Sequence, residues 1–195
     1  MKAHVHSFAH EGRAFSHFIH RLLGAAMLDV ATFEEVEADR SATPQAVTVV
    51  VLSSLAAAIG ARGSGNGAAT VAVFVTAAAI ALVTWAAFAL VTFEIGAHIL
   101  PSAETRVDVG ELLRTLGFAA TPGLIQVFGV FPGATVPVFA IAVVWALAAS
   151  IVAVRQALDY TSTGRALAVC GLALLLSLAI AMVLGVVFGP TLSGS

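Results

Sequence analysis

The chain has 195 residues, of which 59% are hydrophobic and only 10% are charged. A soluble domain has about 25% charged residues, so the composition excludes an ordinary soluble protein and indicates a membrane protein. The formal net charge of −2 argues against a nucleic-acid-binding protein, and no cluster of Lys and Arg marks a strongly anionic lipid site. The single cysteine, Cys170, excludes an intramolecular disulfide.

The first periodic segment, residues 13–30, predicts an amphipathic helix. The helical spacing collects aromatic and aliphatic side chains in one stripe and places arginine and histidine on the opposite face. The stripe contains Phe15, Phe18, Ile19, Leu22 and Leu23, and the polar face contains His10, Arg13, His17, His20 and Arg21. Such a helix suits the plane of the bilayer surface, and protonation of its histidines would add positive charge. The alternative is a soluble helix that packs on a partner domain.

A short acidic segment follows this helix. Thr32 and Glu35 have the spacing of a capping box, which predicts a helix that starts there and continues to Arg40. The acidic residues of this segment are Glu34, Glu35, Glu37 and Asp39. A run of this kind is typical of a solvated face, and we expect it to lie just outside the membrane, near the arginine side chains. Thr43 and Pro44 then predict the start of a longer helix.

Uncharged stretches predict five membrane spans. A spanning helix needs about 20 apolar residues, and residues 41–61, 63–93, 115–154 and 166–195 are free of Lys, Arg, Asp and Glu. As one helix, residues 115–154 would extend roughly 60 Å, about twice the thickness of the hydrocarbon core, so the proline and glycine residues between 128 and 138 divide them into a hairpin. The predicted spans are residues 45–61, 68–93, 112–127, 138–154 and 165–188. Pro122 and Gly123 predict a break within the third, which other helices must cover.

The distribution of basic residues predicts how the chain is threaded. With five spans, Arg62 is the one basic residue among nine that falls on the far side. The positive-inside rule therefore places the amino end in the cytoplasm and the carboxyl end outside. We expect residues 1–40 to form a cytoplasmic segment and residues 41–195 to form an all-α, five-helix membrane domain, located in the inner membrane.

This threading gathers ionisable residues at the cytoplasmic ends of the last four spans. The pairs Glu94–His98 and Arg155–Asp159 have a spacing that allows contact on one helix face. The candidate site for a lipid headgroup or a protein partner consists of Glu94, His98, Arg114, Arg155, Gln156, Asp159 and Arg165. The alternative is that these residues neutralise one another and fix the helix ends at the interface.

No catalytic, metal-binding or phosphate-binding motif is present in the sequence. We therefore expect no enzyme activity, no metal and no cofactor, although His98 is a weak candidate for an axial ligand of a haem or pigment. A small transporter or channel around the broken third span is a further alternative, and it would require a cavity lined by Arg114, Thr121 and Gln126.

Three stretches carry a resemblance to a known family. They are FEEVEADRSATPQA before the first span, LLRTLGFAATPG in the third, and VVWALAASIVAVRQALDYTSTGRA across the fourth span and the following turn. In this order and with five spans, the chain resembles a bacterial member of the Ypt-interacting-protein (YIP) domain family over about residues 20–188. The resemblance implies five spans with a cytoplasmic amino end. The Asp-Leu-Tyr-Gly-Pro motif of eukaryotic members, which act with small GTPases in vesicle traffic, is absent, so GTPase binding is not implied. The resemblance implies no catalytic role for Arg114, Pro122, Arg155, Gln156, Asp159 or Arg165.

Together these patterns predict a non-enzymatic membrane protein that acts as a scaffold or accessory subunit through its cytoplasmic polar face. The expected partners are membrane lipid and another membrane or cytosolic protein, or a second copy of the chain.

Overall fold

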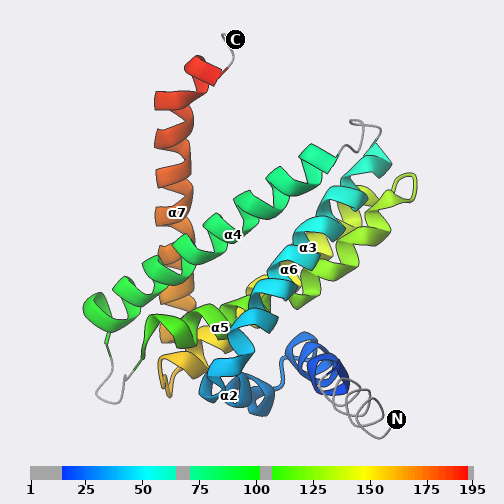
Figure 1. Cartoon of the computed structure of the whole chain (residues 1–195). Helices are drawn as coiled ribbons and strands as arrows, with labels where there is room; N and C mark the ends of the chain where they lie inside the picture. The colour runs from blue at the N-terminus through cyan, green and yellow to red at the C-terminus, as the bar shows by residue number, and fades with distance from the viewer. Residues whose placement is uncertain (1–14, 65–70, 102–106, 193–195) are drawn as a thin grey trace, which may run out of the picture.

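A computed structural model describes residues 15–64, 71–101 and 107–192, and every regular element in these ranges is helical (Figure 1). The all-α prediction is therefore confirmed, while His10 and Arg13 of the predicted polar face lie outside the described residues. The first helix covers residues 15–26. It is followed by α2 (Val30–Ala38), η1 (Arg40–Ala42), α3 (Thr43–Gly60), η2 (Ala61–Ser64), α4 (Val71–Glu94), η3 (Ile95–Ile99), α5 (Val109–Ala119), η4 (Thr121–Val130), α6 (Thr135–Ala157) and α7 (Thr163–Leu192).

Three helical segments are long and apolar enough to cross a membrane, namely Arg40–Gly60, Val71–Ile99 and Thr135–Ala157. They correspond to the first, second and fourth predicted spans. In α7, whose side chains are described only to residue 179, the apolar part Thr163–Ala179 is shorter. The third predicted span, residues 112–127, is divided between α5 and η4. The count of five crossings therefore stays a prediction.

Small residues let α3 approach its neighbours closely. A Cβ atom added to Gly117 of α5 would lie 2.6 Å from the Cβ of Ala46 on α3. At the other end of α3, a Cβ atom on Gly60 would lie 1.8 Å from the backbone oxygen of Gln126 in η4. Neither position has room for a side chain. The helix α3 thus packs closely against both α5 and η4, through small residues, as is typical of helix packing in membranes.

The predicted break in the third span is confirmed, and its freed backbone groups are bonded. The helix α5 ends at Ala119, and Pro122 stands in the first turn of the 3-10 segment η4. The hydroxyl of Ser53 on α3 donates to the carbonyl of Ala120 over 2.8 Å, and that of Thr121 donates to the carbonyl of Phe118 over 2.6 Å. The Ala120 carbonyl also accepts from the amide of Gly123 over 2.9 Å. Because an unpaired carbonyl in apolar surroundings costs several kcal/mol, these bonds make the break tolerable.

Two helices end on residues in the left-handed conformation that are not glycine. Leu28 (φ 61°) follows the first helix and Asp159 (φ 52°) follows α6. At each end the next two amides bond back to the helix: those of Leu28 and Asp29 to Ala25 and Gly24, and those of Asp159 and Tyr160 to Gln156 and Arg155. These paired bonds are Schellman motifs, in which glycine is the usual left-handed residue. A residue with a side chain destabilises the fold by roughly 1 kcal/mol in this conformation, relative to glycine.

Helix starts were predicted with mixed success. The predicted start of a longer helix at Thr43 and Pro44 is confirmed, because α3 begins at Thr43 with the proline in its first turn. The helix α5 begins with a capping box of Asp108 and Glu111, in which both reciprocal hydrogen bonds are present. The expected capping box at Thr32 is wrong, because Asp29 caps α2 by accepting from the amide of Thr32. The helix therefore begins at Val30, and Thr32 lies inside it.

The helices α4 and α7 leave many of their apolar side chains exposed. Figure 1 shows α7 extending away from the group formed by α3, α5 and α6, and α4 crossing it. None of the most apolar window of α4 is buried within the protein. On α7, Leu175 is 67% exposed and Leu178 is 68% exposed. Apolar surfaces of this extent require lipid or another helix to cover them.

The hydrogen bond across the break predicts different effects for two adjacent serines. Ser53→Ala removes the bond that joins α3 to the Ala120 carbonyl, which keeps only the amide of Gly123 as a donor, and is expected to destabilise the protein by about 1 kcal/mol. Ser54→Ala is the matched control, because the Ser54 hydroxyl bonds to the Val51 carbonyl of its own helix and its loss should have little effect. Thermal unfolding in detergent measures both. Equal melting temperatures for the two variants would contradict the role given to Ser53.

Candidate functional site: the polar end of the bundle

The polar side chains of the described residues gather at one end of the helices, which we call the polar end. It is formed by α2, the starts of α3, α5 and α7, the ends of α4 and α6, and η3, all of which lie toward the bottom of Figure 1. The residues of the predicted site all belong to these elements or to the turns between them. Exposed side chains among them are those of Glu94, His98, Arg155, Asp159 and Arg165, whereas Gln156 is half-buried and Arg114 is buried.

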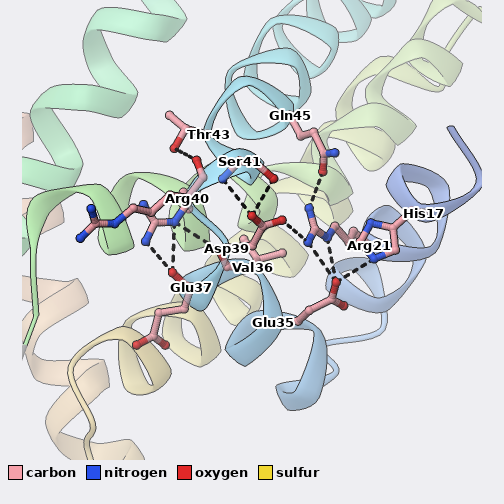
Figure 2. Close-up of polar contacts among 11 residues, drawn as sticks. His17, Arg21, Glu35, Val36, Glu37, Asp39, Arg40, Ser41, Thr43 and Gln45 are labelled. Atoms are coloured by element: carbon pink, nitrogen blue, oxygen red, sulfur yellow. Dashed lines mark hydrogen bonds and ion pairs between the residues drawn. The ribbon is translucent and has the colours of Figure 1, made fainter. Parts of the chain in front are cut away.

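Arg21 is the centre of a polar cluster that joins the first helix to α2 and α3 (Figure 2). Its side chain is 2% exposed. Its Nε and Nη2 atoms donate to Glu35 Oε1 over 3.1 and 3.0 Å, and Nη2 also donates to Asp39 Oδ2 over 2.6 Å. Nη1 donates to Gln45 Oε1 over 2.8 Å. The prediction that Arg21 lies on a solvent-facing side of the helix is wrong, because these acceptors replace water around the guanidinium.

One carboxylate of this cluster, that of Asp39, is held in its charged form. Hydrogen bonds from Ser41, and then from Arg21, lower the pKa of Asp39 to about 2. His17 Nε2 lies 2.9 Å from Glu35 Oε1, the same oxygen that Arg21 contacts. Glu35 and Asp39 are thus more than a solvated face, because they compensate a buried cation.

Arg114 binds the last turn of α2. Its side chain is 4% exposed, and its Nε atom lies 3.2 Å from the carbonyl oxygen of Val36 and 3.1 Å from that of Glu37. Its Nη2 atom also donates to the Glu37 carbonyl. These carbonyls belong to the last turn of α2, where the helix has no N–H donors for them and where a positive charge is favourable. Arg114, predicted as part of a ligand site, therefore has a structural role through its Nε and Nη2 atoms.

Tyr160 joins η3 to the turn between α6 and α7. Its hydroxyl donates to the carbonyl oxygens of Leu100 and Gly96, over 2.8 and 3.2 Å. The Arg165 guanidinium lies over the Tyr160 ring, 5.7 Å from its centroid, and Nη1 donates to the Pro101 carbonyl over 3.3 Å. Burial raises the pKa of the Tyr160 hydroxyl. Tyr160 thereby fixes the region of Glu94 and His98 relative to Arg165.

The predicted pair Glu94–His98 is present. His98 Nδ1 lies 3.2 Å from Glu94 Oε2, and its ring meets Phe93 edge-on at 5.6 Å. His98 lies in the π-helical turn η3, and turns of this kind often occur at functional sites. Both partners are mostly exposed, and no group of three or more potential ligands that could hold a metal ion occurs in the described part of the chain.

The other predicted pair does not form. Arg155 Nε donates to the backbone carbonyl of Tyr160 over 3.2 Å, and no ion pair joins it to Asp159 among the described residues. The chain leaves the helix before Asp159, so the spacing of four no longer places both residues on one face. Gln156 instead bonds to Glu34 on α2, with Nε2 2.9 Å from Oε1.

Among the ionisable residues at the polar end, Glu37 has the largest pKa shift. Partial burial, together with the negative charges of Glu111 and Asp159, raises its pKa to about 7. The charge of Arg114 acts in the opposite direction but does not cancel these effects. The polar end therefore changes its charge near neutral pH.

Sequence reasoning missed Arg21, Glu37 and Tyr160 as members of this end. Tyr160 had a usable signal, because a lone tyrosine in a polar turn between two apolar helices commonly has one hydrogen-bonded atom. Two residues of the predicted transport cavity are bonded within the protein. Arg114 is bonded to α2, and the Thr121 hydroxyl is bonded to the Phe118 carbonyl. Gln126 lies in η4, whose backbone contacts Gly60.

Comparison with known proteins identifies the class. The model of the Yip1 domain matches residues 29–185, which is most of the chain. No curated protein and no solved structure matches it. The chain is a helical membrane protein, and it belongs to the Yip1 domain family. The match begins at Asp29, so α2 and its contacts with Arg114 fall inside the family domain.

The buried guanidinium of Arg21 predicts a large stability effect. Arg21→Met removes every bond to Glu35, Asp39 and Gln45, and we expect a loss of about 3 kcal/mol in the free energy of unfolding. Arg21→Lys keeps the positive charge but not the several N–H donors of the guanidinium, so the loss in the free energy of unfolding should be intermediate. The exposed neighbour His20→Ala is the control and should change stability by less than about 0.5 kcal/mol. Thermal unfolding in detergent gives the ranking, and an Arg21→Met variant as stable as His20→Ala would contradict it.

The raised pKa of Glu37 predicts a pH dependence. A carboxyl whose pKa is higher in the folded than in the unfolded state destabilises the fold as it ionises, so stability falls as the pH rises from about 4.5 through about 7. Glu37→Gln should be more stable than the wild type above pH 7 and similar to it below pH 4.5. Asp159→Asn removes one of the repelling charges and should weaken the dependence. Identical pH curves for the wild type and Glu37→Gln would contradict this prediction.

Proposed function

We propose that this chain is a non-enzymatic scaffold or accessory subunit of the bacterial inner membrane, which presents its polar end to a protein partner in the cytoplasm. The observation that carries the proposal is a difference in burial among the polar residues. Arg21 and Arg114 are buried and bonded within the protein. Arg155, Asp159 and Arg165 are exposed, in or beside the turn between α6 and α7 that Tyr160 holds in place. Charges held in fixed positions favour specific recognition, because little side-chain and loop entropy is lost on binding.

The backbone at Asp159 supports this reading. A glycine in its place would relieve the left-handed conformation, yet the chain has an exposed carboxylate there. Strained residues cluster at functional sites, since their cost is otherwise unnecessary. The charge of Asp159 is thus a candidate for direct contact with a partner.

The proposed threading has five crossings, a cytoplasmic amino end and an external carboxyl end. It counts α3, α4, α6 and α7 as four crossings and α5 with η4 as the remaining one. Laid end to end, α5 and η4 extend roughly 36 Å, enough for the hydrocarbon core of about 30 Å. With this threading, Arg62 is the one basic residue of nine on the external side.

The first part of the test locates the polar end. Asp159→Cys and Arg62→Cys are prepared in a Cys170→Ala background, and a membrane-impermeant maleimide is applied to spheroplasts and to inverted vesicles. Cysteine 159 should react only in inverted vesicles and cysteine 62 only in spheroplasts. Reaction of both positions in the same preparation would contradict the odd number of crossings.

The second part tests recognition. Tagged protein is purified gently from native membranes, and the co-purified proteins are compared for the charge reversals Asp159→Lys and Arg165→Glu. Reversal of a contact charge should reduce the amount of specific partner about tenfold or more. Arg62→Glu, which reverses an exposed charge at the other end of the bundle, is the matched control. Equal recovery of the same proteins with all three variants would contradict a binding role for the polar end.

A further inference from the structure

The helix at residues 15–26 presents two apolar sides to different surroundings. One side packs on the bundle: Ala25 is fully buried, Leu22 is partly buried, and the Phe18 ring meets that of Phe118 on α5 edge-on at 6.4 Å. The other side is open. It carries large apolar residues at every fourth position, with exposed fractions of 66% for Phe15, 36% for Ile19, 57% for Leu23 and 79% for Met27. We call these four residues the open stripe.

This helix is attached firmly to the rest of the protein. The bonds of Arg21 to α2 and α3 hold its inner side. Gly24 lies against Thr32 of α2 so closely that an added Cβ atom would be 2.0 Å from the threonine hydroxyl oxygen. The indole Nε1 of Trp145 on α6 donates to the carbonyl of Ala26 over 2.8 Å. The open stripe therefore has a fixed position relative to α6.

That position adjoins an exposed apolar surface of α6. Trp145 lies within Thr135–Ala157, one of the helices long and apolar enough to cross a membrane, and it is itself 36% exposed. Ile141 and Val144 on the same helix are 57% and 67% exposed. Figure 1 shows the first helix running crosswise to α3 and α6 rather than along them. A helix that lies crosswise to spanning helices is parallel to the plane of the membrane.

We propose that the open stripe of Phe15, Ile19, Leu23 and Met27 is inserted among the lipids of the membrane leaflet at the polar end, continuous with the lipid-facing surface of α6. Exposed His17 and His20 lie on the remaining side of the helix and face the headgroups and water. The helix thus has a bundle side, a lipid side and a water side. This inference does not depend on what the polar end binds.

The test measures whether single positions in the full-length protein are surrounded by lipid or by water. Ile19→Cys, Leu23→Cys and His20→Cys are made in a Cys170→Ala background, spin-labelled and reconstituted in phosphatidylethanolamine–phosphatidylglycerol vesicles. Collision rates with oxygen, which concentrates in lipid, are compared with those of a water-soluble nickel chelate. Ile19 and His20 are successive residues and point about 100° apart, so they form a matched pair. All three sites are exposed, and unchanged thermal unfolding in detergent checks that the variants fold.

We expect oxygen collisions to exceed nickel collisions at positions 19 and 23, and the reverse at position 20. Nickel collisions in excess at all three positions would place the open stripe in water and overturn the proposal. Low collision rates with both reagents at positions 19 and 23 would also overturn it, because they would show that protein, such as a second copy of the chain, covers the stripe.

Discussion

The arrangement of the amino-terminal half depends on two buried guanidinium groups. Arg21 and Arg114 are almost inaccessible to solvent, and a charge removed from water is tolerated only when acceptors satisfy its donors. The short helix α2 supplies acceptors for both. Its carboxylates receive Arg21, and the carbonyls of its last turn receive Arg114. A helix of nine residues is not stable alone, so these bonds and the packing of Phe33 and Val36 keep it folded.

The same rule explains the broken third span and the rigidity of the polar end. At the break, Ser53 donates to the Ala120 carbonyl in addition to the amide of Gly123, and at the polar end Tyr160 donates to the carbonyls of Gly96 and Leu100. In each case a side chain from a different element completes the hydrogen bonding of irregular backbone. Elements that are separate in the sequence are thereby joined at defined atoms, and the charged side chains of the α6–α7 turn are held in place. The proposed recognition surface is a result of this joining.

Much of the fold could be predicted from the sequence, because apolar runs and proline positions report directly on helices and their breaks. The helices α3, α4 and α6 and the interruption at Pro122 were found in this way. The burial of Arg21 was not, because helical periodicity assigns a residue to a face without knowing what packs there. The helix ends at Leu28 and Asp159 were missed since neither is glycine. The bonds of Arg114 to α2 were not foreseen, because spacing does not reveal an acceptor on a distant helix.

The sequence separation of the two arginines from their acceptors has a consequence for biosynthesis. Every acceptor of Arg21 lies within 24 residues of it, so the ribosome has already made all of them when the start of α3 is complete. The carbonyls that receive Arg114 precede it by 77 and 78 residues, across two intervening apolar helices. During translation, α2 can therefore fold against the first helix early, while its final turn stays without its cation until α5 emerges. The growing chain thus acquires its amino-terminal unit in two separate steps.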